Sequence, residues 1–88
     1  MKPLYYLEFA RSYENDGTII PAKKLNWFTI DSFRIGYEDI DTCAHERLSL
    51  QKDLTKWIVR IETAGPIMNL FIRICSRFGW RHWKIVKK

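Results

Sequence analysis

One helix with clear start and stop signals constrains the fold of this chain more than any other sequence feature. Apolar residues recur at spacings of three and four over residues 66–78, as on one face of an α-helix. Proline is well tolerated at the first helical position, and Gly79 is a typical C-terminal cap. The sequence therefore predicts a helix from Pro66 to Phe78. Six residues are predicted to form its inner face: Ile67, Leu70, Phe71, Ile74, Cys75 and Phe78.

The N-terminal segment is predicted to form a β-hairpin. Residues 4–13 are rich in aromatic side chains and lack helical spacing, which favours a strand. The Asp16-Gly17 step suits the positive φ values of a tight turn, so residues 18–20 are expected to begin the return strand. Pro21 cannot donate a ladder hydrogen bond and is expected to end that strand.

The middle of the chain is predicted to contain an extended region followed by a helix. Residues 25–35 are rich in large apolar side chains and are expected to be extended, with a break near Asp31-Ser32 and a stop at Gly36. Asp41 or Thr42 could cap a helix that runs to about Leu54. The alternative to the end of this helix is a hairpin that turns at Gln51-Lys52-Asp53.

Two further strands complete the expected fold. Residues 55–63 contain five β-branched side chains, which favours a strand, although their apolar positions also fit a helical stripe. Residues 80–86 are predicted to form the last strand. We therefore expect one small α+β domain over residues 1–88. It would hold an antiparallel sheet, made of the N-terminal hairpin and a C-terminal strand–helix–strand, with one or two helices packed on one face.

Composition limits where such a protein works. The N-terminal apolar stretch is interrupted by Glu8, so no signal peptide is predicted, and no apolar run reaches the length of a membrane span. Two cysteines are too few for a disulfide scaffold. We expect a cytoplasmic protein with reduced thiols, and a single Cys43–Cys75 disulfide is the alternative.

The charge of the chain is concentrated in its C-terminal third. Residues 1–62 hold nine basic and ten acidic side chains, whereas residues 63–88 hold six basic side chains and no acidic one. Such a segment attracts acidic protein surfaces or phosphates. Arg73 and Arg77 lie one helical turn apart and are expected to point to solvent. The predicted binding residues for a protein or nucleic acid are Arg73, Arg77, Trp80, Arg81, His82 and Lys84.

Catalytic and metal-binding patterns are not evident in the sequence. The four glycines are scattered and form no phosphate-binding loop. Cys43 and His45 could act as nucleophile and base only if a turn or helix brings them together. Cys43 and His45 could form a two-Cys, two-His zinc site together with Cys75 and His82, but the spacing of these four residues matches no standard zinc pattern. We therefore predict no catalytic residue, no metal site and no cofactor.

These observations favour a small non-enzymatic binding protein. We expect a regulator or inhibitor, of the type that phages and mobile elements often encode, that docks a basic, aromatic-containing surface on an acidic protein or nucleoprotein complex. The alternative is direct nucleic-acid binding by the basic C-terminal third, with cations on phosphates and tryptophans under bases. A homodimer is also compatible with the sequence. Attachment of the 66–78 helix to a membrane surface is the least favoured hypothesis, because its apolar side is expected to be core.

Overall fold

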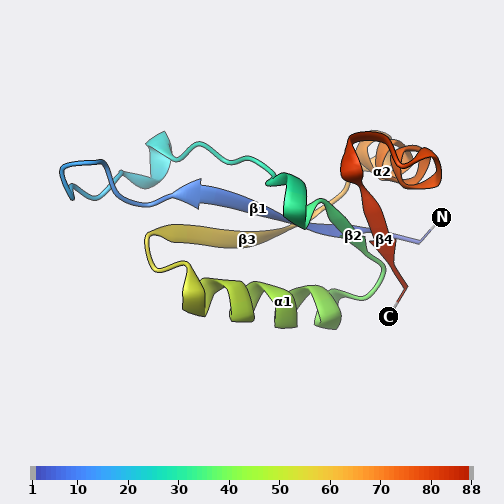
Figure 1. Cartoon of the computed structure of the whole chain (residues 1–88), viewed down its shortest axis with the longest axis horizontal. Helices are drawn as coiled ribbons and strands as arrows, with labels where there is room; N and C mark the ends of the chain where they lie inside the picture. Colours follow the sequence, from blue (N-terminus) through green and yellow to red (C-terminus); the bar gives the residue numbers. More distant parts are fainter. Residues whose placement is uncertain (1, 88) are drawn as a thin grey trace.

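A computed structural model describes residues 2–87 and contains a four-stranded mixed sheet with two α-helices packed on it (Figure 1). The strands are β1 (Tyr5–Arg11), β2 (Ile35–Tyr37), β3 (Trp57–Thr63) and β4 (Lys84–Val86). The helices are α1 (Ile40–Asp53) and α2 (Pro66–Phe78), and the 3₁₀ turns are η1 (Ala22–Lys24), η2 (Asp31–Phe33) and η3 (Trp80–His82). The predicted α+β class is therefore confirmed.

The sheet has the strand order β3-β1-β2-β4 and is mostly antiparallel. β1 pairs antiparallel with β3 along its whole length, from Tyr5 opposite Thr63 to Arg11 opposite Trp57. β1 also pairs antiparallel with β2, whereas β2 and β4 are parallel. Parallel neighbours need a crossover connection, and α1, β3 and α2 lie between β2 and β4 in the chain. The strand predicted over residues 55–63 is confirmed as β3.

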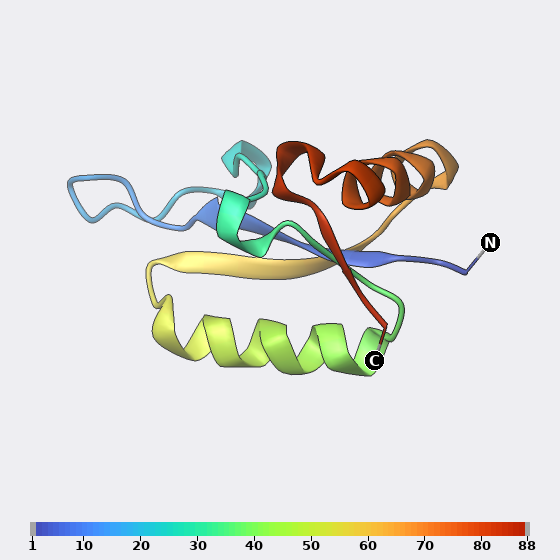
Figure 2. The same cartoon turned by 45° about the vertical axis from the view of Figure 1, so that its right-hand side comes forward.

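The two helices lie on opposite faces of the sheet, which differs from the expected single covered face (Figures 1 and 2). Successive side chains of a strand point to opposite faces. In β1, Leu7 and Phe9 belong to the core that includes Cys43 of α1. Tyr6 instead packs in the core that includes Ile72 of α2. The sequence could not show this arrangement, because both faces of the short strands carry apolar residues.

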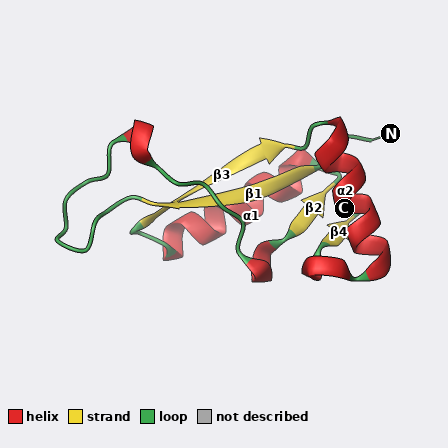
Figure 3. Cartoon of the chain, turned by 90° about the horizontal axis from the view of Figure 1, so that it is seen from above, coloured by secondary structure: helices red, strands yellow, loops and turns green. Residues whose placement is uncertain are grey.

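The N-terminal turn is confirmed, but the return strand is reduced to one β-bridge between Tyr13 and Ile19. After Pro21 the chain folds back over the part of the sheet that α2 does not cover, and the hairpin tip extends beyond the strands (Figure 3). The Trp27 ring lies 3.9 Å from the guanidinium carbon of Arg60 on β3. This returning segment therefore covers part of the second face of the sheet.

Gly36 lies in the middle of β2, so the prediction that it stops a strand is wrong. A Cβ atom at this position would lie 3.0 Å from Cγ2 of Ile72 and 3.5 Å from Cδ1 of Leu4. Ile72 is fully buried on α2. The glycine is therefore explained by the close approach of α2 to the sheet, rather than by a break in the strand.

Helix α1 replaces the alternative hairpin and protects one edge of the sheet. Its cap is Asp39, whose carboxylate accepts hydrogen bonds from the backbone N–H and the hydroxyl of Thr42, so the predicted caps are two to three residues late. Near its C-terminal end, Gln51 donates from Nε2 to the carbonyl of Trp57 at 2.7 Å. The Gln51 Oε1 atom accepts from the backbone N–H of Val59 at 2.9 Å. A side chain thus satisfies two backbone groups on the outer edge of β3, where no strand is paired.

Candidate functional site

Helix α2 begins and ends as predicted, at Pro66 and Phe78, but it is rotated relative to the predicted inner face. Cys75 is fully buried as expected, and Phe71 packs against the core. The other four members of the predicted inner face are exposed, and we call them the outer stripe: Ile67 (87% exposed), Leu70 (50%), Ile74 (45%) and Phe78 (74%). The helix therefore presents an apolar side to solvent.

Two polar residues of α2 explain this rotation. Asn69 is buried and donates from Nδ2 to the carbonyl of Lys2 at 3.0 Å, while its Oδ1 accepts from Nε of Arg73 at 2.7 Å. Arg73 also donates from Nη2 to the Lys2 carbonyl at 2.7 Å and lies 3.8 Å from the Glu38 carboxylate. These contacts satisfy the polar groups on the sheet side of the helix.

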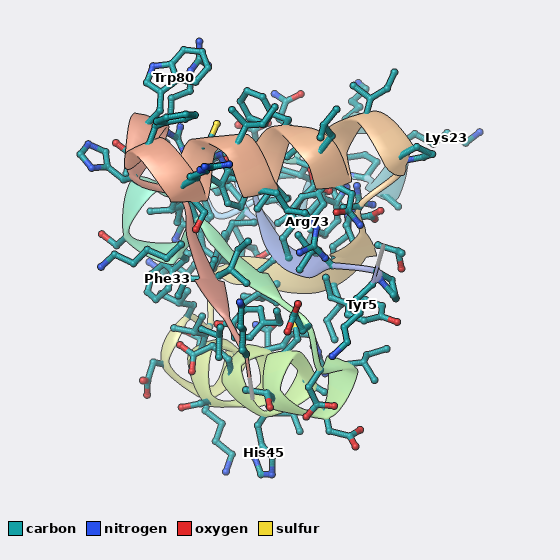
Figure 4. All side chains as sticks on the ribbon, turned by 90° about the vertical axis from the view of Figure 1, so that its right-hand side faces the viewer. Tyr5, Lys23, Phe33, His45, Arg73 and Trp80 are labelled. Carbon is teal, nitrogen blue, oxygen red and sulfur yellow. The ribbon has the colours of Figure 1, made fainter. Side chains whose placement is uncertain are left out.

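Arg73 is consequently held by contacts within the protein. It extends from α2 toward the strands, and less than a quarter of its side chain is exposed (Figure 4). The prediction that it points to solvent is wrong. Arg77 is exposed, as predicted.

The five remaining predicted residues are brought together where α2 ends, and we call this surface the basic end: Arg77, Trp80, Arg81, His82 and Lys84. All five are exposed. They come from the last turn of α2, from η3 and from the first residue of β4. Trp80 is 54% exposed and stands away from the body of the molecule (Figure 4). Arg77, Arg81 and Lys84 form no ion pair with a carboxylate of residues 2–87.

The basic end is built on a strained turn, where the sequence predicted regular strand. Residues 80–82 form η3, and Arg81 and His82 have φ angles of 55° and 61°. These values lie in the left-handed region, which non-glycine residues seldom occupy. Arg34 donates from Nη1 to the carbonyl of Arg81 at 3.0 Å and pairs through Nη2 with Asp31 at 3.0 Å. Arg34 therefore connects η3 to η2, through one hydrogen bond and one ion pair.

Aromatic and cationic side chains are stacked at this turn. The guanidinium carbon of Arg81 lies 4.8 Å from the centre of the Trp80 ring. Phe71 approaches the same ring edge-to-face, with centroids 6.0 Å apart. These contacts fix the orientation of Trp80 while leaving about half of it exposed.

A groove of about 730 Å³ lies beside the basic end. One wall comes from η3 and β4 and includes His82 and Lys84, and the other comes from η2 and includes Asp31 and Ser32. Trp83 and Ile85 are among its apolar lining residues. Sequence analysis missed the η2 wall and Arg34, because they are separated from the basic segment by about half of the chain and carry no motif.

No protein-family model, curated protein or solved structure matches this chain.

The cysteine and histidine residues do not assemble into a site. Cys43 is buried on α1, whereas His45 points away from the sheet (Figure 4). Burial, reinforced by the charge of Glu46, raises the pKa of the Cys43 thiol to about 11, so the thiol is protonated at neutral pH. Cys43 and Cys75 are both free and belong to the cores on opposite faces of the sheet, so the alternative disulfide is not formed.

Neither a metal cluster nor a membrane span is found in the described part of the chain. No three His, Cys, Asp or Glu side chains of residues 2–87 are grouped so that they could hold a metal ion. Over the same residues, neither helix combines the length and apolar character that crossing a bilayer requires.

Proposed function

We propose that this chain is a non-enzymatic binding protein that docks its basic end on an acidic protein and regulates or inhibits that protein by covering its surface. The observation that carries the proposal is the exposed Trp80–Arg81 stack on a strained turn. Tryptophan and arginine dominate the energetic centres of protein interfaces. Left-handed conformations at two successive non-glycine residues cost of order 1–3 kcal/mol each, and such strain clusters at functional sites.

Electrostatics favours an acidic partner. Arg77, Arg81 and Lys84 have no carboxylate partner within residues 2–87, so their charges are available to a second molecule. Complementary charge accelerates encounter and fixes the orientation of the two surfaces. Exposed charges are strongly screened at physiological salt, so binding should weaken as the ionic strength rises.

The geometry of Trp80 favours a protein over nucleic acid as the partner. A base would have to stack on the face of the indole ring, as in single-strand binding proteins. Arg81 already lies over this ring and Phe71 contacts it edge-to-face. A base that stacks on the Arg81 side of the ring must displace the guanidinium group, whereas a protein surface can contact the exposed stack as it stands.

Capture experiments with a matched pair of variants test the proposal. The tagged protein is used to capture partners from candidate host lysates, alongside Arg77→Glu/Arg81→Glu. The control is Lys23→Glu/Lys24→Glu, which makes the same change in charge at two exposed residues of η1. In the view of Figure 4, Trp80 lies at the upper left and Lys23 at the right.

We expect an acidic protein that the wild type and the control retain and the first variant loses. Each close charge pair at an interface contributes about 1.5 kcal/mol or more, so the double reversal should weaken binding about 100-fold or more. Equal capture by both double variants would refute the proposal. Tight, salt-sensitive binding to oligonucleotides without an acidic protein partner would replace it with the nucleic-acid alternative.

A further inference from the structure

The outer stripe of α2 is an apolar surface that the proposed function does not use. Its members Ile67, Leu70, Ile74 and Phe78 follow one another at spacings of three or four along one side of a 13-residue helix. Contiguous exposed apolar surface of this kind marks interaction sites. We propose that a second copy of this chain covers the outer stripe, with the two α2 helices packed antiparallel about a two-fold axis.

The order of residues along the stripe supports a second copy as the occupant. A two-fold interface requires one surface to be complementary to itself. The stripe is nearly symmetric about the middle of α2, because Ile67 and Phe78 lie at its two ends while Leu70 and Ile74 lie between them. In an antiparallel pair, Ile67 of one copy therefore meets Phe78 of the other, and Leu70 meets Ile74. Each apolar residue finds an apolar partner.

The two ends of the stripe also have complementary shapes. An apolar hollow of about 500 Å³ lies at the N-terminal end of α2, lined by Gly65, Pro66, Ile67, Met68 and Phe71. Phe78, at the C-terminal end, is largely exposed and projects from the helix. Antiparallel packing places the Phe78 ring of each copy at the hollow of the other, so the same contact is made twice.

Charge selects the antiparallel arrangement over the parallel one. Parallel packing would place the two basic ends side by side, with no acidic residue in segment 63–88 to offset them. Antiparallel packing separates them by about the length of α2, roughly 20 Å. This distance is more than twice the Debye length at physiological salt, about 8 Å, so the repulsion is largely screened.

The size of the surface predicts a weak, concentration-dependent dimer. A standard protein interface buries about 800 Å² on each partner. One face of a 13-residue helix, about 20 Å long, offers less area than this. We therefore expect dissociation constants on the order of micromolar or weaker.

Sedimentation of the full chain between about 1 μM and 1 mM tests the dimer. We expect the wild type to change from monomer to dimer over this range and Ile74→Asp to stay monomeric. The control Ile19→Asp places the same charge at an exposed apolar residue of the N-terminal hairpin and should dimerise like the wild type. Circular dichroism verifies that each variant is folded, and Phe78→Ala provides a second disruption at a largely exposed position.

Cysteine cross-linking tests the antiparallel register. An oxidised mixture of Ile67→Cys and Phe78→Cys chains should form a covalent dimer, because these positions face each other across the pair. Either variant alone should not, since its two introduced cysteines would lie about 16 Å apart, beyond disulfide reach. The native Cys43 and Cys75 are fully buried and should not interfere.

Three results would overturn the proposal. The first is a wild type that stays monomeric at the highest concentration. The second is efficient cross-linking of a single variant, which would indicate parallel packing. The third is a monomer that binds vesicles of phosphatidylglycerol and phosphatidylcholine and loses this binding in Ile74→Asp. That result would indicate that a membrane surface, rather than a second copy, covers the outer stripe. Dimerisation and partner capture depend on different residues, so either can fail while the other holds.

Discussion

Replacing Gly36 with alanine should destabilise the protein through one specific contact. The added Cβ atom would lie 3.0 Å from Cγ2 of Ile72, which is closer than the 3.4–4 Å of ordinary van der Waals contact, so Ile72 would have to shift. Ile72 cannot swing away, because it is β-branched, helical and fully buried, and its χ1 angle is strongly restricted. Overpacking a well-filled core costs about 1–3 kcal/mol.

Part of this cost is offset in the unfolded state. A Gly→Ala change lowers the entropy of the unfolded chain and stabilises the folded form by about 0.4–1 kcal/mol. We therefore expect the free energy of unfolding of Gly36→Ala to fall by about 1–2 kcal/mol in urea titrations. Gly65→Ala is the control, because nothing lies within 4 Å of a Cβ at that position. It keeps the unfolded-state gain without the clash, so it should not be destabilised by more than about 0.5 kcal/mol.

A double-mutant cycle isolates the contact. Leucine at position 72 has no Cγ2 atom, so Ile72→Leu should relieve the clash and make Gly36→Ala less costly in that background. The expected coupling is about 0.5–1 kcal/mol or more. Additive effects of Gly36→Ala and Ile72→Leu, or a neutral Gly36→Ala, would refute the argument that α2 packs directly on β2 at this glycine.

The structure makes two further predictions. Arg73→Glu should lower the free energy of unfolding by about 2–4 kcal/mol, because it removes the hydrogen bonds to Asn69 and to the Lys2 carbonyl and leaves a carboxylate beside Glu38. Arg77→Glu, on the exposed side of the helix, should change the free energy of unfolding by less than about 0.5 kcal/mol. Equal melting temperatures of the two variants would contradict this prediction. Stability should also fall as the pH rises from about 9 to 12, because burial raises the pKa of Cys43 to about 11 and that of Tyr37 to about 12, so the folded state holds protons that the unfolded state releases. Denaturation curves across that range measure the loss, and Tyr37→Phe should flatten its upper part.

The sequence predicted the boundaries of α2 because they depend on local chemistry. Proline at the first position and glycine in the left-handed conformation at the cap act within one turn of the backbone. The same is true of the turn at Asp16-Gly17 and of the β-branched strand β3. Each of these elements was predicted from a few adjacent residues and is present in the structure.

The orientation of α2 could not be predicted, because it depends on residues far apart in the chain. Asn69 and Arg73 look like solvent-facing residues in the sequence, yet the Lys2 carbonyl satisfies both of them. Eight of the thirteen residues of α2 are apolar, so turning the helix still leaves apolar side chains for the core. Periodicity alone therefore allowed more than one inner face.

The candidate site was predicted in part. Five of the six predicted binding residues lie together at the basic end, because they are close in sequence and follow a helix that ends where expected. The left-handed turn at Arg81 and His82 runs against local preference, and it is tied by Arg34 from another part of the chain. Sequence patterns do not reveal a conformation of this kind, because contacts from distant parts of the chain impose it against the local preference of the residues.

The amide of Gln51 has a consequence for how this protein avoids uncontrolled assembly. β3 is an edge strand rich in β-branched residues, and open edges of that composition recruit strands from other chains and can seed fibrils. Because Gln51 pairs with the backbone of Trp57 and Val59 as a neighbouring strand would, an incoming strand must first displace a side chain that α1 holds in place. Helix α1 thereby hinders the addition of a foreign strand at the Trp57–Val59 end of this edge.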